Sequence, residues 1–259
     1  MSVNINTKLV KELRDATGIS VMQCRNALTE ADGDMNKALA ILKKSSSDIA
    51  LKKAGREAKD GRVDVKTSDK KCVLVALHCE TDFVSRNDDF VKLLSDLGDM
   101  ALNTGVENMK ASAKDMIDSI IQKTGEKIEL GDVYEIVGDV LGSYIHNNKN
   151  AVVVSLTGGD KDLARDIAMH ITAMKPEYIS KDEINEEAKN MMTEVFQKEV
   201  AGIDKPENIK KKMLEGKIAT YFKEKTLVDQ PFIKNPNETI GQLLEKNKAQ
   251  IKEVKRYSI

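Results

Sequence analysis

The residues best suited to chemistry follow an apolar run in the segment VLVALHCETDFVSRNDDF, residues 73–90. The run stops at Glu80, and a carboxylate and a phenyl ring then stand side by side at Asp82 and Phe83, before a polar cluster. Aromatic residues make up only 4% of the chain and tryptophan is absent, so a phenylalanine just outside the apolar run needs an explanation. The residues alone leave two explanations open. Phe83 caps the core where a strand meets a helix, as most phenylalanines are buried, or it faces a partner.

Cysteine and histidine are the other side chains with nucleophilic or metal-binding chemistry, and the chain has three of each: Cys24, Cys72, Cys79, His78, His146 and His170. An odd number of sparse cysteines predicts reduced thiols and no disulfide framework. The wide Cys72 to Cys79 spacing and the dispersed histidines do not match zinc ligands, so we predict no metal site. Adjacent strand residues point to opposite faces, which argues against His78 and Cys79 as a base and nucleophile pair. His170 has apolar neighbours at helical spacing and is predicted to be a packing residue.

No segment has the pattern of a nucleotide or nucleic-acid site. A glycine-rich loop ending in Lys-Ser or Lys-Thr is missing, and LTGGDKD, residues 156–162, lacks its spacing. Lys and Arg number 41 against 42 Asp and Glu, for a formal net charge of -1, and the two signs are interleaved in almost every predicted helix. With few aromatic residues to stack on bases, the chain is expected to hydrolyse no nucleotide, to need no cofactor and to bind no nucleic acid directly.

Length and composition indicate a globular protein of more than one domain. The 259 residues are 41% hydrophobic, which is enough for a sizeable core. The N-terminal sequence MSVNINTKLVKELRDATG becomes charged before any apolar run that would suit a signal peptide. No run of about eighteen apolar residues occurs, so we expect a soluble, cytoplasmic protein that does not cross a membrane.

The apolar periodicity of residues 9–42 predicts three short helices. Gly18 is expected to cap the first helix, Ser20 to begin the second with a capping box, and Asp34 to cap the third. The polar segment KKSSSD, residues 43–48, is expected to end the pattern and to act as a tether. These signals predict a small helical bundle.

The remaining pattern predicts sheets and helices in alternating blocks. Residues 62–67 and 72–79 form a predicted hairpin around SDKK, and the second strand, nearly all apolar, is expected to be central in its sheet. Helices are predicted from 88 and over 109–124, strands between 127 and 157, then a helix that Pro176 ends and a last strand over 249–257.

A long, charged and helix-rich segment spans residues 180–226 and is broken by GIDKPEN, residues 202–208. Two antiparallel helices are predicted to bury apolar stripes against each other. The stripes are Ile184, Ala188, Met191, Met192, Val195 and Val200 on one helix, and Ile209, Met213, Ile218 and Phe222 on the other. The hairpin is either a self-contained protrusion or a docking arm, and the residues leave both open.

Several of these segments together resemble the bacterial elongation factor Ts family. The opening LVKELRDATGISVMQCRNALTEADGDMNKALAIL, then TDFVSRNDDF, GDVLGSYIH, DIAMHITAMKP and QPFIKNPNETIGQLL, occur in the order and spacing of that family over nearly the whole chain. The resemblance implies a guanine nucleotide exchange factor, not an enzyme, that acts on the GTPase elongation factor Tu in translation elongation. It binds the GDP form, dislodges Mg²⁺ and promotes GDP release so that GTP can rebind.

The resemblance also implies an α+β fold with four segments. Residues 1–47 form a three-helix bundle similar to ubiquitin-associated domains, and residues 48–61 form a linker helix. Residues 62–138 and 139–259 form the two parts of a core of antiparallel sheets flanked by helices. The second part carries an inserted antiparallel helical hairpin, similar to a coiled coil, at about residues 180–226.

Site residues carry over from the family position by position. TDFV here, Thr81, Asp82, Phe83 and Val84, is similar to the element implicated in dislodging Mg²⁺, with the Phe83 ring wedged into the GTPase domain beside the nucleotide. N-terminal positions that face a helix of that domain in the family match Arg14, Val21, Met22 and Arg25. Ile233 and Lys234 match a loop that touches a more distant domain, where the family often has a more apolar residue than Lys234.

Two points depart from the family pattern or stay open. The family commonly continues past the last strand with a further helical module, whereas this chain stops at KRYSI; such a version is expected to remain an exchange factor that relies more on core contacts. A homodimer within a larger complex stays open. The alternatives from other classes are a tethering protein that binds a partner without changing nucleotide affinity, and a thiol enzyme that uses Cys79.

Overall fold

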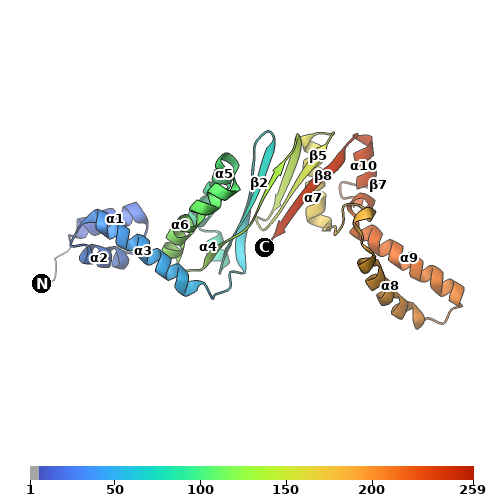
Figure 1. The fold of residues 1–259 in the computed structure, drawn as a ribbon, viewed down its shortest axis with the longest axis horizontal. Helices are drawn as coiled ribbons and strands as arrows, with labels where there is room; N and C mark the ends of the chain where they lie inside the picture. The colour runs from blue at the N-terminus through green and yellow to red at the C-terminus, as the bar shows by residue number, and fades with distance from the viewer. Residues whose placement is uncertain (1–5) are drawn as a thin grey trace. The chain divides into compact units, whose positions relative to one another are not determined.

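The computed structural model describes residues 6–259 and is mixed α and β, which confirms the predicted α+β class (Figure 1). The first five residues of the expected 1–47 segment lie outside the described residues. Contacts divide the chain into two compact units. The first contains the described residues up to Glu135 with Asn147–Ala151 and Tyr257–Ile259, and the second contains Ile136–His146 and Val152–Arg256. The division into four segments stays a prediction.

The first unit combines a helical bundle with a three-stranded sheet and its covering helices (Figure 1). The elements from the N-terminus to the end of the first sheet are α1 (Thr7–Thr17), α2 (Val21–Glu30), α3 (Met35–Lys53), β1 (Asp60–Thr67), β2 (Lys71–Cys79), α4 (Asp82–Ser85), α5 (Asp88–Thr104), α6 (Val106–Thr124) and β3 (Ile128–Val137).

The bundle of α1, α2 and α3 forms where the capping residues predict it. Gly18 ends α1 with φ of 69°, a conformation in which a residue with a Cβ is strained. Ser20 accepts a hydrogen bond from the Gln23 amide at the start of α2, and Asp34 caps α3 in the same way. The buried core of the bundle, from the helices and their connections, consists of Val10, Leu13, Ile19, Cys24, Ala27, Leu28, Ala31, Ala38 and Leu42.

The predicted tether is wrong, because α3 continues through residues 43–48 to Lys53. The segment has no glycine or proline, so nothing in the backbone stops the helix. Tertiary contact then stabilises it: α3 packs on α6, Ser46 is buried, and the Ser47 hydroxyl donates a hydrogen bond of 2.9 Å to Asp118. A serine run was therefore a poor signal for a flexible segment here.

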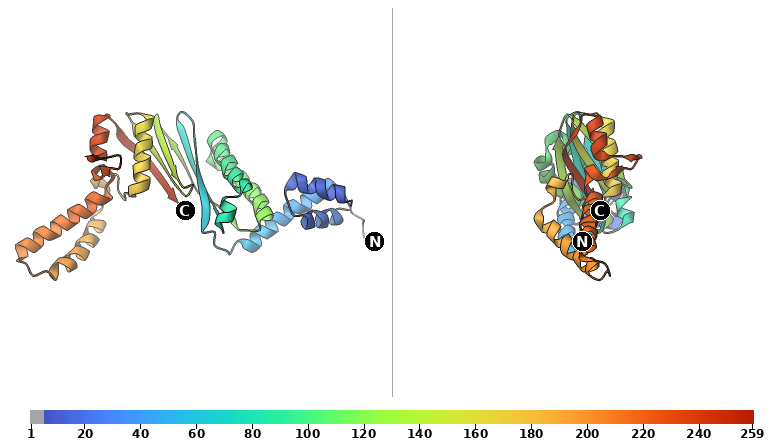
Figure 2. Two further views of the ribbon diagram at one scale, coloured as in Figure 1. Left: turned by 180° about the vertical axis from the view of Figure 1, so that it is seen from behind. Right: turned by 90° about the vertical axis from the view of Figure 1, so that its right-hand side faces the viewer.

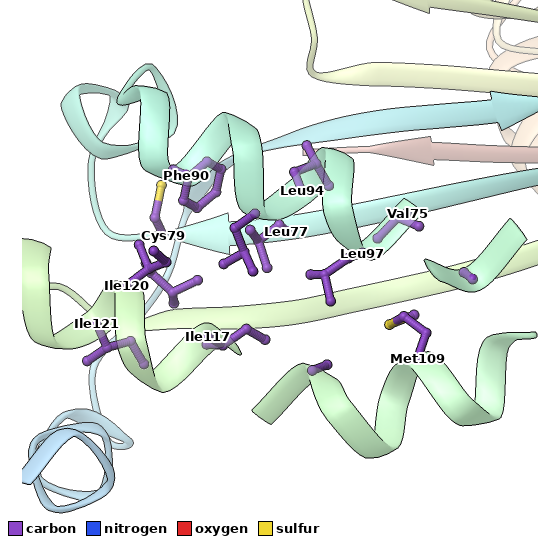
Figure 3. Close-up of a cluster of buried hydrophobic side chains, with 14 of the residues drawn as sticks. Val75, Leu77, Cys79, Phe90, Leu94, Leu97, Met109, Ile117, Ile120 and Ile121 are labelled. Atoms are coloured by element: carbon purple, nitrogen blue, oxygen red, sulfur yellow. The ribbon is translucent and has the colours of Figure 1, made fainter. Parts of the chain in front are cut away.

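The first sheet has the order β1-β2-β3, and β1 and β2 pair antiparallel from Thr67 opposite Cys72 to Asp60 opposite Cys79. The hairpin and the central position of β2 are thus confirmed. Helix α5 packs on β1 and β2, and α6 packs on α5. Figure 3 shows the resulting core, in which β2 residues such as Val75 and Leu77 lie with Phe90 and Leu97 of α5. This core fixes the end of β2, where the chemistry-bearing residues begin.

The second unit is built on the sheet β4-β5-β8 and a small two-stranded sheet, β6-β7. The remaining elements are β4 (Val140–His146), β5 (Asn150–Thr157), α7 (Lys161–Met174), η1 (Lys181–Glu183), α8 (Glu186–Ala201), α9 (Glu207–Lys225), η2 (Leu227–Asp229), β6 (Pro231–Phe232), β7 (Asn235–Thr239), α10 (Ile240–Lys246) and β8 (Gln250–Ser258). Helix α7 packs on β4, and Thr239 with Gln242 forms a complete capping box at the start of α10.

Helices α8 and α9 form the predicted hairpin and lie side by side in every view (Figures 1 and 2). The predicted burial of the two apolar stripes is confirmed only in part: Ile184, Val200 and Phe222 are buried, and Ala188, Met192, Met213 and Ile218 are half-buried. Within the two helices only Val200 and Phe222 are buried, whereas Met191 is 59% exposed and Val195 and Ile209 are exposed as well. Among the helices of residues 6–259, none combines the length and the hydropathy of a membrane-spanning segment.

Candidate partner-binding site

The one-turn helix α4 follows β2 (Figure 1), and Phe83 lies on it with an exposed side chain. Its side chain is 83% exposed, whereas its neighbour Val84 is 9% exposed and joins the core cluster of the first unit. Successive residues on a helix point about 100° apart, so one of the two faces solvent when the other faces the core. The explanation that Phe83 caps the core is therefore wrong, and Val84 takes that position.

Two hydrogen bonds from Thr81 to Glu126 hold the backbone just before Phe83. The Thr81 amide donates to one oxygen of Glu126 at 3.0 Å, and the Thr81 hydroxyl donates to the other at 2.6 Å. Glu126 follows Gly125, the left-handed residue that ends α6. This contact could not be predicted from the sequence, because Glu126 is 45 positions away and no local pattern marks it. It fixes the entry to α4.

A second set of charges holds the preceding residue, Glu80. Its carboxylate accepts from the Lys127 amide at 2.6 Å and from the Arg56 guanidinium at 3.1 and 3.2 Å. The Lys127 amide, and then the Arg56 side chain, hold the pKa of Glu80 below its ordinary value. We call residues 80–84 the corner. Hydrogen bonds hold Glu80 and Thr81 before Phe83, and the buried Val84 follows it, while the Phe83 side chain is exposed.

Asp82 is the one corner carboxylate that remains half-exposed beside the ring. Its Oδ2 lies 3.0 Å from Nη2 of Arg86, one turn later on the chain. Both side chains are substantially exposed, so water screens the pair and it is readily exchanged for other partners. Ser85, behind it, is buried and donates its hydroxyl to the Asp82 carbonyl.

The thiol of Cys79 is a structural group beneath the corner. It is fully buried in the core and donates to the Thr81 carbonyl at 3.2 Å. Burial, with the nearby Asp60 and Glu126 carboxylates, raises its pKa to about 12, so the thiolate that a nucleophile needs is disfavoured. His78 points elsewhere, with Nε2 2.7 Å from the Tyr257 hydroxyl. This arrangement contradicts a Cys79 thiol enzyme. Among residues 6–259 no three His, Cys, Asp or Glu side chains group as a metal would require.

The N-terminal positions predicted from the resemblance are all exposed on the bundle. Val21 and Met22 form the first turn of α2, and Met22 is 66% exposed, while Cys24 and Leu28 of the same helix are buried. Arg14 lies near the end of α1 and Arg25 on α2, and both side chains face solvent. Two apolar and two cationic side chains thus remain free for contact.

Ile233 and Lys234 form the two-residue turn between β6 and β7, which we call the Ile233 turn. Ile233 is 36% exposed, and its amide donates to His170 Nδ1 at 3.3 Å. Lys234 Nζ lies 2.5 Å from Asp166 of α7. The predicted residues therefore occupy three places: the corner and the bundle in the first unit, and the Ile233 turn in the second. His170 is fully buried, which confirms that it packs within the fold.

Comparison with known proteins gives the family. A family model described as elongation factor TS matches residues 80–259. A protein named elongation factor Ts from Hahella chejuensis is 38% identical over 98% of this chain and 92% of its own length. Proteins of the same name from Thioalkalivibrio sulfidiphilus and Pseudomonas aeruginosa are each 36% identical. They match 99% and 98% of this chain, and 92% and 91% of their own lengths. The chain belongs to the elongation factor Ts family, a family of translation elongation factors.

Proposed function

We propose that this protein is a guanine nucleotide exchange factor for elongation factor Tu. It binds the GDP form of that GTPase, dislodges Mg²⁺ and promotes GDP release, so that GTP can rebind. Family membership supports the partner and the process. The observation that carries the mechanism is the 83% exposure of Phe83 on a backbone anchored by Glu126 and Glu80.

An exposed phenyl ring on an anchored corner is suited to insertion into a partner. Burying such a side chain is worth about 1.5–3 kcal/mol, and close-packed interiors must shift an element to admit the ring. Because hydrogen bonds already hold Thr81 and Glu80, little backbone order is lost when the ring inserts. The binding free energy is then available to displace an element of the GTPase.

Nucleotide release follows from binding that favours one conformation of the partner. A GTPase holds GDP through backbone amides around the phosphates and through Mg²⁺. A protein that binds best to a conformation without some of these contacts offsets the cost of losing them. Asp82 adds a carboxylate at the position before Phe83. When the Asp82–Arg86 ion pair opens on binding, the charge of this carboxylate acts on the metal and the phosphates.

The other two groups of residues supply contact away from the nucleotide. We assign Arg14, Val21, Met22 and Arg25 to a helix of the GTPase domain, and Ile233 with Lys234 to a more distant domain. Their exposure supports this, since exposed apolar side chains at Val21, Met22 and Ile233 gain by burial. No step of the proposed function forms or breaks a covalent bond, so this protein acts by binding and is not an enzyme.

The test is the release rate of fluorescently labelled GDP from purified elongation factor Tu in excess unlabelled GDP. The wild-type chain is expected to accelerate release. Phe83→Ala is expected to lose about tenfold or more of the acceleration, since about 1.4 kcal/mol corresponds to tenfold in rate. Leu51→Ala removes another exposed apolar side chain, on α3, and serves as the matched control with wild-type activity.

The outcomes separate the functions considered. Binding of the wild-type chain to the GTPase with an unchanged release rate would indicate a tethering protein and overturn the proposal. Equal release rates for the wild type and Phe83→Ala would remove Phe83 from the mechanism. Cys79→Ser should exchange normally if it folds, because the thiol is buried and its pKa is raised.

A further inference from the structure

A chain of buried hydrogen bonds reaches the Ile233 turn from inside the second unit. His170 lies on α7 and is fully buried, and Gln230, between η2 and β6, is almost as buried. The His170 ring lies with Nε2 2.9 Å from Gln230 Oε1 and with Nδ1 3.3 Å from the Ile233 amide nitrogen. The Gln230 amide group in turn donates to the Glu224 carbonyl at the end of α9, at 2.6 Å.

The donors and acceptors in this series of hydrogen bonds allow only one placement of the proton on the His170 ring. A backbone N–H only donates, so Nδ1 of His170 is the acceptor and bears no proton. The proton of the neutral ring is then on Nε2, which donates to Gln230 Oε1. Gln230 uses its oxygen toward His170 and its nitrogen toward Glu224, so both ring nitrogens of His170 and both polar side-chain atoms of Gln230 have partners. The geometry therefore selects the Nε2–H tautomer.

The turn has few other restraints. Strand β6 is only two residues long, and its pairing with β7 is irregular between Pro231 and Phe232. Phe232 is buried, with its ring centroid 6.1 Å from that of His170. Lys234 reaches Asp166, one helical turn before His170 on α7. Helix α7 thus holds both residues of the turn: His170 binds the backbone amide of Ile233, and Asp166 forms an exposed ion pair with Lys234.

We propose that His170 is a positioning residue for partner binding: by accepting the Ile233 amide hydrogen, it holds the Ile233 turn in the conformation that docks on the GTPase. The inference rests on the proposed function, in which that turn is a contact. A turn that is already ordered loses less conformational entropy on docking, so removal of the acceptor weakens binding. It leaves the step at Phe83 unchanged, because that residue lies on α4, in the first unit.

Two substitutions separate the two ring nitrogens. His170→Asn places an amide oxygen near the position of Nδ1, so the Ile233 amide keeps an acceptor while the bond to Gln230 is lost. His170→Gln reaches the position of Nε2, so Gln230 keeps its partner while the Ile233 amide is left without one. Each variant removes one buried hydrogen bond, and each is expected to destabilise the fold to a similar extent.

The measurement is labelled GDP release from elongation factor Tu over a range of exchange-factor concentrations. His170→Gln is expected to raise the half-saturating concentration about tenfold, with a maximal rate within about twofold of wild type. His170→Asn is expected to stay within about threefold of wild type. Equal half-saturating concentrations for the two variants would overturn the proposal, since a role in stability alone treats them alike.

We call the hydrogen bond from the Ile233 amide to His170 Nδ1 the clamp. Two further readouts distinguish a failure of the clamp from a failure of the proposed function. Amide hydrogen exchange at Ile233 in the free protein is expected to be slow in the wild type and in His170→Asn and fast in His170→Gln; equally fast exchange in all three overturns the clamp. If neither variant folds, nitrogen NMR of the wild-type ring decides, because a protonated Nδ1 contradicts it. If Ile233→Ala binds normally while Phe83→Ala loses exchange, the turn is not a contact and the proposal fails while the proposed function stands.

Discussion

Residues 83 and 84 are neighbours on one helical turn and have opposite tasks. Phe83 is exposed and free to bind, whereas Val84 packs into the core and holds α4 against the sheet. The family resemblance assigns TDFV as a whole to one action. The structure divides it into a side chain that faces outward, a side chain that anchors the turn, and Thr81, whose amide and hydroxyl are fixed by Glu126.

This division predicts different effects for two alanine substitutions. Val84→Ala is expected to lower the free energy of unfolding by about 1–3 kcal/mol, because it removes two buried methyl groups. Phe83→Ala is expected to change it by less than about 0.5 kcal/mol, as at other surface positions. Urea denaturation followed by circular dichroism measures both. A large loss for Phe83→Ala would mean that the ring packs on the fold in solution.

The buried imidazole of His170 makes stability depend on pH. Burial lowers the pKa of His170 from its ordinary 6.5, although the hydrogen bond to Gln230 opposes the shift. As the pH falls below 6.5, the unfolded chain binds a proton at this residue while the folded chain does not, so the folded state loses stability until the lowered pKa is passed.

His170→Gln isolates this contribution, since every other titratable group is common to both proteins. The variant is expected to be less stable than wild type at about pH 7.5, and the difference in unfolding free energy is expected to shrink toward about pH 5.5. Urea denaturation at the two pH values measures this. A difference that grows on acidification would mean that the folded protein holds residue 170 protonated.

At the scale of elements, local signals predicted what local forces determine. Gly18, Ser20 and Asp34 are found at the helix ends where their chemistry favours them, and the apolar run of β2 is the central strand. Contacts between distant segments were not predictable. No residue near Ser47 in the sequence indicates its hydrogen bond to Asp118, which stabilises the continuation of α3. Likewise, no residue near Thr81 indicates its hydrogen bonds to Glu126. Of the candidate site, the residue types were predicted and the anchors were not.

The hairpin contains a glycine, Gly216, whose presence the fold does not require. Gly216 lies within α9, where glycine is unfavourable, and a Cβ built there meets no atom within 4 Å. Gly216→Ala is therefore expected to stabilise the second unit by about 1 kcal/mol, through higher helix propensity and lower entropy of the unfolded chain. Thermal unfolding followed by circular dichroism measures the change.

Gly142→Ala is the matched control for that experiment. Gly142 is in β4, and a Cβ there would lie 2.3 Å from the backbone nitrogen of Arg165 on α7. Strand and helix would have to separate, so this variant is expected to lower the melting temperature. A gain at both positions, or a loss at both, would show that the free space around the two glycines does not govern their tolerance.

At the scale of the whole molecule, the contacts assigned to the partner are spread over both units, and the chain as a whole carries almost no net charge. The formal net charge is -1, so long-range attraction does not explain recognition. Exposed apolar side chains at Met22, Phe83 and Ile233 offer burial at three places. We expect two kinds of contribution. Contacts at the bundle and the Ile233 turn bind the GTPase whether or not nucleotide is present, whereas the Phe83 contact is favourable only where GDP and Mg²⁺ are loosened.

Thermodynamic reciprocity turns this distinction into the last prediction. If this protein weakens GDP binding as proposed, GDP must weaken binding of this protein by the same factor. Calorimetry with nucleotide-free and GDP-loaded elongation factor Tu gives that factor as a ratio of two Kd values. Met22→Ala is expected to raise both Kd values by a similar multiple and to leave the ratio unchanged, while Phe83→Ala is expected to move the ratio toward one. If Met22→Ala changed the ratio as much as Phe83→Ala does, the bundle would take part in release itself, and the corner would not be its sole origin.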